Sequence, residues 1–539
     1  MSLSTHLQNQ NLDSKEEEMN DIIRDAPFGQ LLRYVTRNRV LKYPEEIEGF
    51  ECPCSYEQND SGNFKKGTDD AQHRGQPDVT PVADDKAEEY TPEPALEKTK
   101  TAPADIESPK RNSTSSDEES RLQRTRTVGS HIERTRTLPW TEARLEAEHT
   151  LALEKTRSKG QVVVPTKTAD GTVLVDWYTL DDVANPQNWS QAKKAWTAFL
   201  ICLYTFVVYA SSSIYVSSEA LVMERFGVGD FKAGLGLALY VLGYGIGPLF
   251  FAPLSEVPLF GRNIPYIATF AFFVILAIPT ALVDNLGGLL FLRFLLGFFG
   301  SPCLANGGAT MGDMYSLLYL PYPLAMWVVA AFAAPALGPI LSGFAVYAEN
   351  WRWSQWEILW MAAPIFLLFL FLLPETQPTT ILLHRAARLR TRTGNPRIRT
   401  QTEIDRRGIS FGASLLDSII KPIEIGVKDP AVFFVNLYTA LTYGIYYSFF
   451  EVFPLVYPVE YGFNVGETAL VFISIIVGCG IAVTVHFSYL KWYLVPDIMK
   501  NGLRQQEHRL VPAIFASLGP PVGLFIFGQF SVRRLDCKI

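Results

Sequence analysis

Charged side chains are scarce in the apolar part of this sequence, and the few that occur there suggest ion or proton chemistry. Arg293, Glu451 and His486 stand within or near the ends of long apolar runs. Because a charge in hydrocarbon is costly, such residues usually mark a pathway for protons, ions or substrates. For Arg293 a structural role, in hydrogen bonds to carbonyl groups, stays open. His486 precedes Lys491 by five residues and is interpreted as interfacial.

Glu451 lies toward the end of the seventh apolar run, in the sequence YYSFFEVFP. An ionised carboxylate there could bind a cationic molecule and release it when protonated, so one side chain would exchange a cation for a proton. The alternative is a carboxylate that is paired at the membrane interface.

Polar and aromatic residues form a second group of candidates for contact with a small molecule. They are Ser212 and Tyr215 in the first apolar run and Tyr443 and Tyr447 in the seventh. Aromatic faces attract lipophilic cations through the ring quadrupole. Each tyrosine has an alternative explanation, because aromatic residues also form belts at the two membrane surfaces.

Nine apolar segments after residue 194 carry these candidates. Each is close to the length that a helix needs to cross about 30 Å of hydrocarbon, and Pro520 and Pro521 interrupt the last one. A sheet is excluded because lipid-facing backbone must form its hydrogen bonds within its own segment. The sequence therefore predicts an all-α integral membrane protein. The predicted spans are Ala195–Val216, Phe231–Ala252, Ile264–Val283, Leu286–Gly308, Pro321–Tyr347, Ile358–Leu373, Ala431–Tyr457, Thr468–Leu490 and Val511–Gly528.

The domain organisation follows from the spacing of these spans and from composition. Residues 57–141 hold few large apolar side chains and are predicted to be disordered. Near residues 27–39 the apolar residues Phe28, Leu31, Leu32 and Val35 have helical spacing and indicate a short basic amphipathic helix. This helix could lie on the inner leaflet or dock on the protein, or it could have no role. The predicted parts are a tail (1–190), a six-helix domain (191–373), a basic loop (374–429), an incomplete three-helix domain (430–528) and an unrelated end (529–539).

The loops also give an orientation and exclude several classes of protein. Lys and Arg concentrate in alternate loops on the side of the N-terminus, whereas loops such as 217–230 contain few, so the N-terminus is predicted to be cytoplasmic. The six cysteines are scattered and predict neither a disulfide framework nor a metal site. No phosphate-binding loop and no enzyme chemistry are visible, and no cofactor or nucleic-acid partner is expected.

Three short motifs resemble signatures of the major facilitator superfamily. In APLSEVPLFGRN, Glu256 stands for the usual Asp and is followed by Gly261 and Arg262, which resembles the cytoplasmic gating motif. Arg293 in RFLLGFFG resembles the arginine that the family uses in proton coupling. The third motif, APALGPILSG, is similar to the antiporter motif, and its matching residues are Gly338, Pro339 and Gly343.

Longer segments resemble fungal multidrug or polyamine drug:proton antiporters with twelve spans. They read DWYTLDDVANPQNWS, NWRWSQW, LPETQPTTILLHRAARLR and FFEVFPLVYPVEYGFNVGE. The resemblance implies proton-coupled export of drugs, polyamines or other small lipophilic or cationic compounds. It also implies the plasma membrane, or the vacuolar membrane, as the location. Kinases could act on the RTRT repeats at Arg124–Thr127 and Arg134–Thr137, where simple low complexity is the alternative.

The resemblance stops near Gly528, so the sequence predicts a six-plus-three arrangement that departs from the family pattern. Two hypotheses result. The chain represents a proton-coupled exporter whose full form has twelve spans. Alternatively, it is a truncated membrane protein that does not transport, either a regulator or sensor or an artefact of the gene model.

Overall fold

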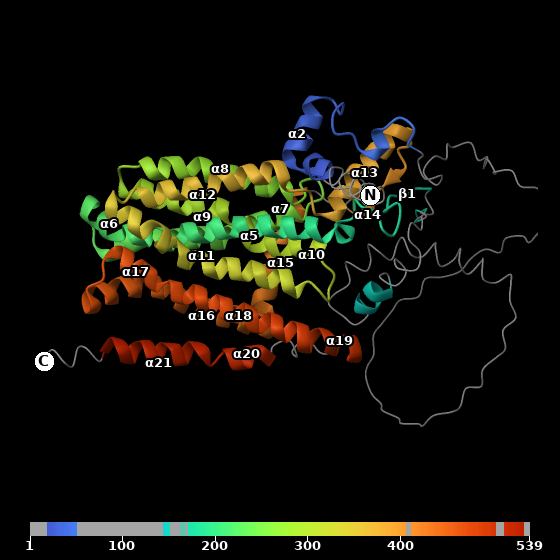
Figure 1. Cartoon of the computed structure of the whole chain (residues 1–539). Coiled ribbons are helices and arrows are strands. Elements are labelled where there is room, and N and C mark those ends of the chain that lie inside the picture. The colour runs from blue at the N-terminus through green and yellow to red at the C-terminus, as the bar shows by residue number, and fades with distance from the viewer. Residues whose placement is uncertain are drawn as a thin grey trace, which may run out of the picture.

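The computed structural model describes residues 19–50, 144–150, 163, 165, 167, 171–405, 411–502 and 511–532. The segment predicted to be disordered, 57–141, and the end of the chain, 533–539, lie outside the described residues. The RTRT repeats lie outside them as well. Within the described part, the elements are helices apart from one pair of two-residue strands (Figure 1). The predicted all-α membrane fold is confirmed.

The six apolar segments of the first half each form helices of membrane length, and all six qualify as membrane spans by length and composition. The first span is longer than expected, because a short helix, α6, continues it into the predicted loop 217–230. The helices are α5 (Gln191–Ser213), α6 (Glu219–Phe226), α7 (Asp230–Ser255), α8 (Asn263–Leu282), α9 (Leu286–Gly300), α10 (Pro302–Met314), α11 (Pro321–Ala348) and α12 (Trp353–Leu372).

The second half contains two more of the eight candidate spans among the described residues, Val465–Asn501 and Val511–Gln529. The seventh predicted span forms a 27-residue helix, α16, but is not among the eight. Pro520 and Pro521 lie just after the break between α20 and α21. The helices are α16 (Pro430–Val456), α17 (Val465–Val471), α18 (Ile473–Tyr489), α19 (Val495–Asn501), α20 (Val511–Ala516) and α21 (Gly519–Val532).

Polar residues at the helix starts explain where several spans begin. The side chain of Ser190 accepts a hydrogen bond from the Lys193 amide at the start of α5. Asp429 accepts from two amides at the start of α16, and Asn464 forms a reciprocal capping pair with Glu467 at α17. Such caps satisfy amides that have no partner within the helix. They place the span boundaries that periodicity alone leaves uncertain.

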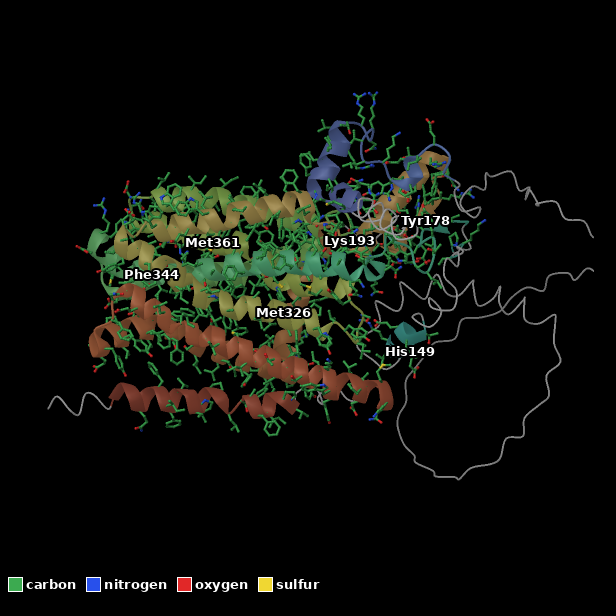
Figure 2. The ribbon with its side chains drawn as sticks, viewed as in Figure 1. His149, Tyr178, Lys193, Met326, Phe344 and Met361 are labelled. Carbon is green, nitrogen blue, oxygen red and sulfur yellow. The ribbon has the colours of Figure 1, made fainter. Side chains whose placement is uncertain are left out.

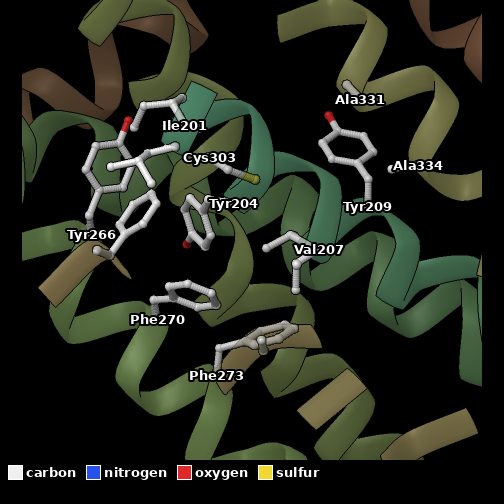
Figure 3. Close-up of a cluster of buried hydrophobic side chains, with 14 of the residues drawn as sticks. Ile201, Tyr204, Val207, Tyr209, Tyr266, Phe270, Phe273, Cys303, Ala331 and Ala334 are labelled. Atoms are coloured by element: carbon white, nitrogen blue, oxygen red, sulfur yellow. The ribbon is translucent and has the colours of Figure 1, made fainter. Parts of the chain in front are cut away.

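The main core lies inside the first half. Its buried members all come from between Trp189 and Leu373. Figure 3 shows part of it, where the ring of Tyr204 packs on Phe270 with centroids 4.5 Å apart. Close backbone contact also holds the helices together: a side chain on Gly297 of α9 would clash with the carbonyl group of Tyr240 on α7. The first half therefore packs as a unit.

A second, polar assembly covers one end of the bundle. We call it the clasp and define it as residues 19–50, 171–190 and 374–405. In it, strand β1 pairs in parallel with β2, and Figure 2 places Tyr178 and Lys193 at this end, with Phe344 at the opposite end. Its elements, and the helix that follows them, are α2 (Pro27–Val35), β1 (Val173–Leu174), α13 (Pro378–Thr393), β2 (Ile398–Arg399), α14 (Gln401–Asp405) and α15 (Phe411–Lys428).

Ion pairs hold the clasp together. Arg385 of α13 donates to the Asp182 carboxylate at 2.7 Å, and Arg388 pairs with Glu45 at 3.2 Å. Burial opposes ionisation of Asp182, but the charge and hydrogen bonds of Arg385 hold the pKa of this carboxyl below its ordinary value. The predicted basic loop 374–429 is thus largely helical, and much of its positive charge is paired within the protein.

Candidate functional site

Arg293 is completely buried in the middle of the first half. Its guanidinium donates three hydrogen bonds to backbone carbonyl groups: to Gly236 of α7 at 3.2 Å and to Ser211 and Ser212 of α5 at 2.8 and 2.7 Å. A planar fork of donors suits three fixed acceptors better than a single ammonium group would. Arg293 therefore ties α9 to α5 and α7, and it carries its charge without a carboxylate directly bonded to it.

Aromatic rings enclose the same guanidinium. Tyr215 and Tyr240 place their ring centroids 5.0 and 4.6 Å from the Arg293 Cζ atom. Tyr215 is fully buried, and its hydroxyl donates to the carbonyl group of Ala233 at 3.0 Å. This position is not that of an interfacial belt residue. Tyr215 is instead a neighbour of Arg293.

Glu451 lies beside a second acid, Glu219 of α6. One oxygen of each carboxyl group lies near Gly234 of α7, at 3.7 Å for Glu219 and 3.8 Å for Glu451 from the point where a Cβ on that glycine would stand. Two carboxyl groups this close can share one proton, because the proton removes the repulsion between two negative charges. Glu219 and Glu451 therefore form a candidate site for one proton at the contact between the first half and α16.

Two further charges act on this carboxyl pair. The positive charge of Arg293 attracts Glu219, and the negative charge of Asp230, at the start of α7, repels it. The pair is half-buried. A site with one proton, two carboxyl groups and a nearby fixed cation can change its net charge by one unit when a proton leaves or a cation enters.

The predicted aromatic candidates of α16 meet the first half through their hydroxyl groups. Tyr447 shares a hydrogen bond of 3.0 Å with the hydroxyl of Ser212, and Tyr244 donates to Tyr447 at 3.2 Å and to Tyr443 at 3.5 Å. The rings of Tyr443 and Tyr447 are 5.0 Å apart. Three of the four predicted cavity residues are therefore brought together at the contact between the halves.

The gating motif forms an ion network. The Arg262 guanidinium donates to Glu256 at 2.7 Å and to Asp313 of α10 at 3.2 Å, and also to the hydroxyl of Ser255 at 2.9 Å. The predicted pair is thus joined by an acid from another helix. Asp313 lies at the end of α10, where it fixes the turn between α7 and α8 against the bundle.

Glu375 completes this turn from the start of the clasp. The half-buried side chain of Glu375 accepts hydrogen bonds from the amides of Arg262 and Asn263, both at 3.1 Å, and from two amides of its own segment at 2.9 Å. Burial raises its pKa, against the lowering effect of these donors. Gly261 has φ 65°, and a Cβ there would lie 2.5 Å from the Glu375 carboxylate. Only glycine fits this position.

The antiporter motif lies on α11 and provides close contacts in two directions. A Cβ on Gly338 would stand 2.6 Å from the Ala210 carbonyl oxygen of α5. A Cβ on Gly343 would stand 2.8 Å from the Cβ of Ala469 on α17. The carbonyl group of Pro339 accepts from the hydroxyl of Ser217 at 3.3 Å. This helix therefore contacts both halves through its small residues.

Sequence reasoning missed Glu219, Asp313 and Glu375. Glu219 was assigned to a loop, although the following residues carry the signals of a short helix: an acid in the first turn, Arg225 in the last, and a left-handed glycine, Gly227, at the end. Glu375 stands in the segment LPETQPTTILLHRAARLR and Asp313 follows Arg293 by 20 residues, but only the fold shows what they bind. His486 was singled out and lies on α18, which ends at Tyr489.

A metal site and the cavity at the clasp are the other candidates, and both have less support. Among the described residues, no group of three or more His, Cys, Asp or Glu side chains could hold a metal ion. A cavity of about 840 Å³ lies at the clasp, lined by the 19–50 segment, α13 and the start of α8. Neither Glu219 nor Glu451 lines this cavity.

These features define a polytopic helical membrane protein with a half-buried acid pair between its two parts, as expected of a transporter. The chain belongs to the Major Facilitator Superfamily, whose sequence profile matches residues 201–533. The predicted family is confirmed, and the class is that of a multi-pass membrane transporter rather than an enzyme.

Named relatives come from several fungi. The chain is 44% identical over 363 residues to the MFS-type transporter pyvG of Aspergillus violaceofuscus, covering 67% of each chain. It is 40% identical over 354 residues to fluconazole resistance protein 1 of Saccharomyces cerevisiae, covering 66% of this chain and 64% of that protein. It is 38% identical to transporter mfs1 of Schizosaccharomyces pombe over 67% of this chain and 68% of the other. The matches span about two thirds of these relatives.

Proposed function

We propose that this protein exports small lipophilic or cationic compounds, such as drugs or polyamines, in exchange for protons. The names of similar proteins support the substrate class, since one is a fluconazole resistance protein and another a cycloheximide resistance protein. They favour a transporter over the alternative of a membrane protein that does not transport. The plasma membrane and a cytoplasmic N-terminus are part of the proposal, because Lys and Arg concentrate in the loops on that side.

The observation that carries the proposal is the carboxyl pair of Glu219 and Glu451. One acid belongs to the first half and the other to α16, so the pair forms where the two halves meet. A cation that binds there replaces the shared proton, because the site cannot readily hold both. Protonation from the other side of the membrane then releases the cation. The tyrosine rings of α16 offer faces for a lipophilic cation next to this site.

Arg293 acts as a positioning residue and as a fixed charge in this scheme. Its three hydrogen bonds hold α5 and α7 in place around the acid pair, and its fixed positive charge lies close to Glu219. Movement between inward-open and outward-open states would break the Ser212–Tyr447 hydrogen bond. Exchange of one proton for one monovalent cation moves no net charge, so the pH difference across the membrane drives the cycle, with about 1.4 kcal/mol per pH unit and without ATP.

Export from proteoliposomes tests the proposal. The full chain is reconstituted with a fluorescent lipophilic cation, ethidium, and a pH gradient is imposed. We expect Glu451→Gln to reduce gradient-driven exchange at least about tenfold, because it keeps the shape and removes the titrating group. Glu219→Gln should also reduce gradient-driven exchange.

Glu224→Gln is the matched control, since Glu224 is exposed on the same helix as Glu219. It should transport as the wild type does. Normal pH-dependent exchange by both Glu451→Gln and Glu219→Gln would refute the role of the pair. Wild-type exchange that ignores the pH gradient would refute proton coupling itself.

A further inference from the structure

Helix α2 and the turn after it project from the side of the bundle at the clasp end. Figure 1 shows α2 beside the ends of α8 and α12, running across the direction of the spans. Its contact with the membrane-spanning part includes Phe28, whose ring centroid lies 4.6 Å from that of Phe371 on α12. A helix in this position lies at the depth of the membrane surface and parallel to it.

One face of α2 packs against the protein, and the other face is exposed. Gly29 and Arg33 are buried, and Arg33 pairs with Glu46 at 2.7 Å, which fixes the helix to the segment that follows it. Leu31, Tyr34 and Val35 are 57%, 83% and 70% exposed. On a helix, these three residues lie on the side that adjoins Phe28, away from Arg33.

This exposed apolar face continues the lipid-facing surface of the spans. Phe371, which Phe28 contacts, is itself 39% exposed on α12, and Ile264 at the start of α8 is 54% exposed. Side chains exposed on membrane spans face acyl chains. The apolar side of α2 therefore extends the same surface at the level where the hydrocarbon ends.

Positive charges stand at the end of this apolar face. Arg37, Arg39 and Lys42 are all exposed. The turn that carries them is held in an unusual backbone conformation, with Arg37 and Asn38 at φ 51° and 58°. The neighbouring acid Glu46 is engaged with Arg33 and does not neutralise them. An apolar helix face bordered by exposed basic residues is the pattern of a helix that lies in a membrane surface.

We propose that α2 and the turn through Lys42 bind anionic phospholipid in the leaflet on the clasp side of the membrane. Leu31, Tyr34 and Val35 enter the boundary of the acyl chains, and Arg37, Arg39 and Lys42 contact the lipid phosphate and carboxylate groups. Lipid explains this surface better than a protein partner does, because the surface is continuous with the lipid-facing side of α12 and its charge is opposite to that of the leaflet.

The cavity at the clasp adds a second observation at the same place. It has a volume of about 840 Å³ and lies between the 19–50 segment and the first turns of α8. Ile264 and Ile267 of α8 and Pro27 of α2 contribute apolar walls, while Arg24 and Asp25 contribute a charged edge. The apolar wall on α8 suits an acyl chain, whereas the charged lining holds six acids against four Lys or Arg side chains, so the anionic headgroup is assigned to Arg37, Arg39 and Lys42 and not to this cavity.

Amide hydrogen exchange of the full chain in nanodiscs tests the proposal. One set of discs contains phosphatidylcholine alone, and the other contains roughly a quarter phosphatidylserine. We expect the amides of residues 28–42 to exchange about fivefold more slowly in the anionic discs. The amides of α8 should exchange equally in both, which shows that the bundle is intact. Equal exchange of residues 28–42 in both discs would overturn the proposal and leave a protein partner as the occupant.

Charge variants identify the residues responsible. The triple variant Arg37→Gln, Arg39→Gln, Lys42→Gln should lose the difference between the discs, whereas Lys428→Gln should keep it, because Lys428 is an exposed cation elsewhere in the chain. A triple variant that keeps the full difference would also overturn the proposal. The measurement needs neither substrate nor proton gradient, so it can fail or succeed independently of the transport function.

Discussion

The two halves of this protein are packed very differently. In the six spans of the first half, 22% to 78% of the most apolar stretch is buried, whereas the corresponding shares are 17% in Val465–Asn501 and 0% in Val511–Gln529. The described residues of the second half are buried mainly where they meet the first, as in the cluster of Phe450, Phe453 and Phe472 with Tyr215 and Leu237. The first half is thus a complete packing unit, and the second half is attached to it along one face.

This difference explains where the candidate site lies. Arg293 and Glu219 are held by the close-packed half, whereas Glu451 and the tyrosines arrive on α16 from the half with fewer contacts. The hydroxyl of Tyr446, for instance, reaches across to the Phe332 carbonyl group at 2.7 Å. The rigid half holds the fixed charge of Arg293, and the less constrained half brings the second acid, Glu451. This arrangement suits a site that must open and close.

The largest expected effect tests the difference in packing between the two halves. Gly297→Val should prevent folding, because its side chain would clash with the Tyr240 carbonyl group, and such overpacking costs about 3 kcal/mol or more. Gly478→Val in α18 should be tolerated, since no atom lies within 4 Å of the position of its Cβ. The yield of monodisperse protein in size-exclusion chromatography measures both. Equal yields of the two variants would show that the first half is no more tightly packed than the second.

A smaller effect sharpens the role of the rigid half. Arg293→Lys keeps the charge but cannot donate to Gly236, Ser211 and Ser212 together, so transport of ethidium should fall about tenfold while the protein still folds. Initial exchange rates in proteoliposomes give the measurement. Arg225→Lys, at an exposed residue of α6, is the control. Wild-type rates for Arg293→Lys would mean that charge alone matters.

The smallest effect concerns the clasp that covers the first half. Asp182→Asn removes one acid from Arg385 and should cost about 1 to 3 kcal/mol of local stability at neutral pH. The pKa of Asp182 is held below its ordinary value of 3.8, so its contribution is present above that pH and is lost as the pH falls through the lowered pKa. The difference in amide exchange of α13 between wild type and variant should shrink in the same range.

Glu48→Gln, at an exposed acid, serves as the control for the clasp prediction. It should leave exchange in α13 unchanged at every pH. A difference between wild type and Asp182→Asn that grows as the pH falls would contradict the assignment of Asp182 as the ionised partner of Arg385.

Much of the fold followed from the sequence, because span length and hydrophobicity are local properties. The same holds for Arg293, which stands out as a charge in an apolar run. The contacts of the site did not follow, because Glu219 and Glu451 are far apart in the chain and only the fold brings both beside Gly234 of α7. The clasp was hidden for the same reason: Glu45 pairs with arginines more than 300 residues later.

The parallel pairing of β1 with β2 has a consequence for how the chain is made. Val173 is synthesised before the first span, and its partner Ile398 follows about 225 residues later. At about 5 to 20 residues per second, the first strand waits on the order of 10 to 45 seconds for the second. In that interval all six spans of the first half are translated. Closure of the strand pair is therefore a late event in biosynthesis, and it can occur only after the first half has been made.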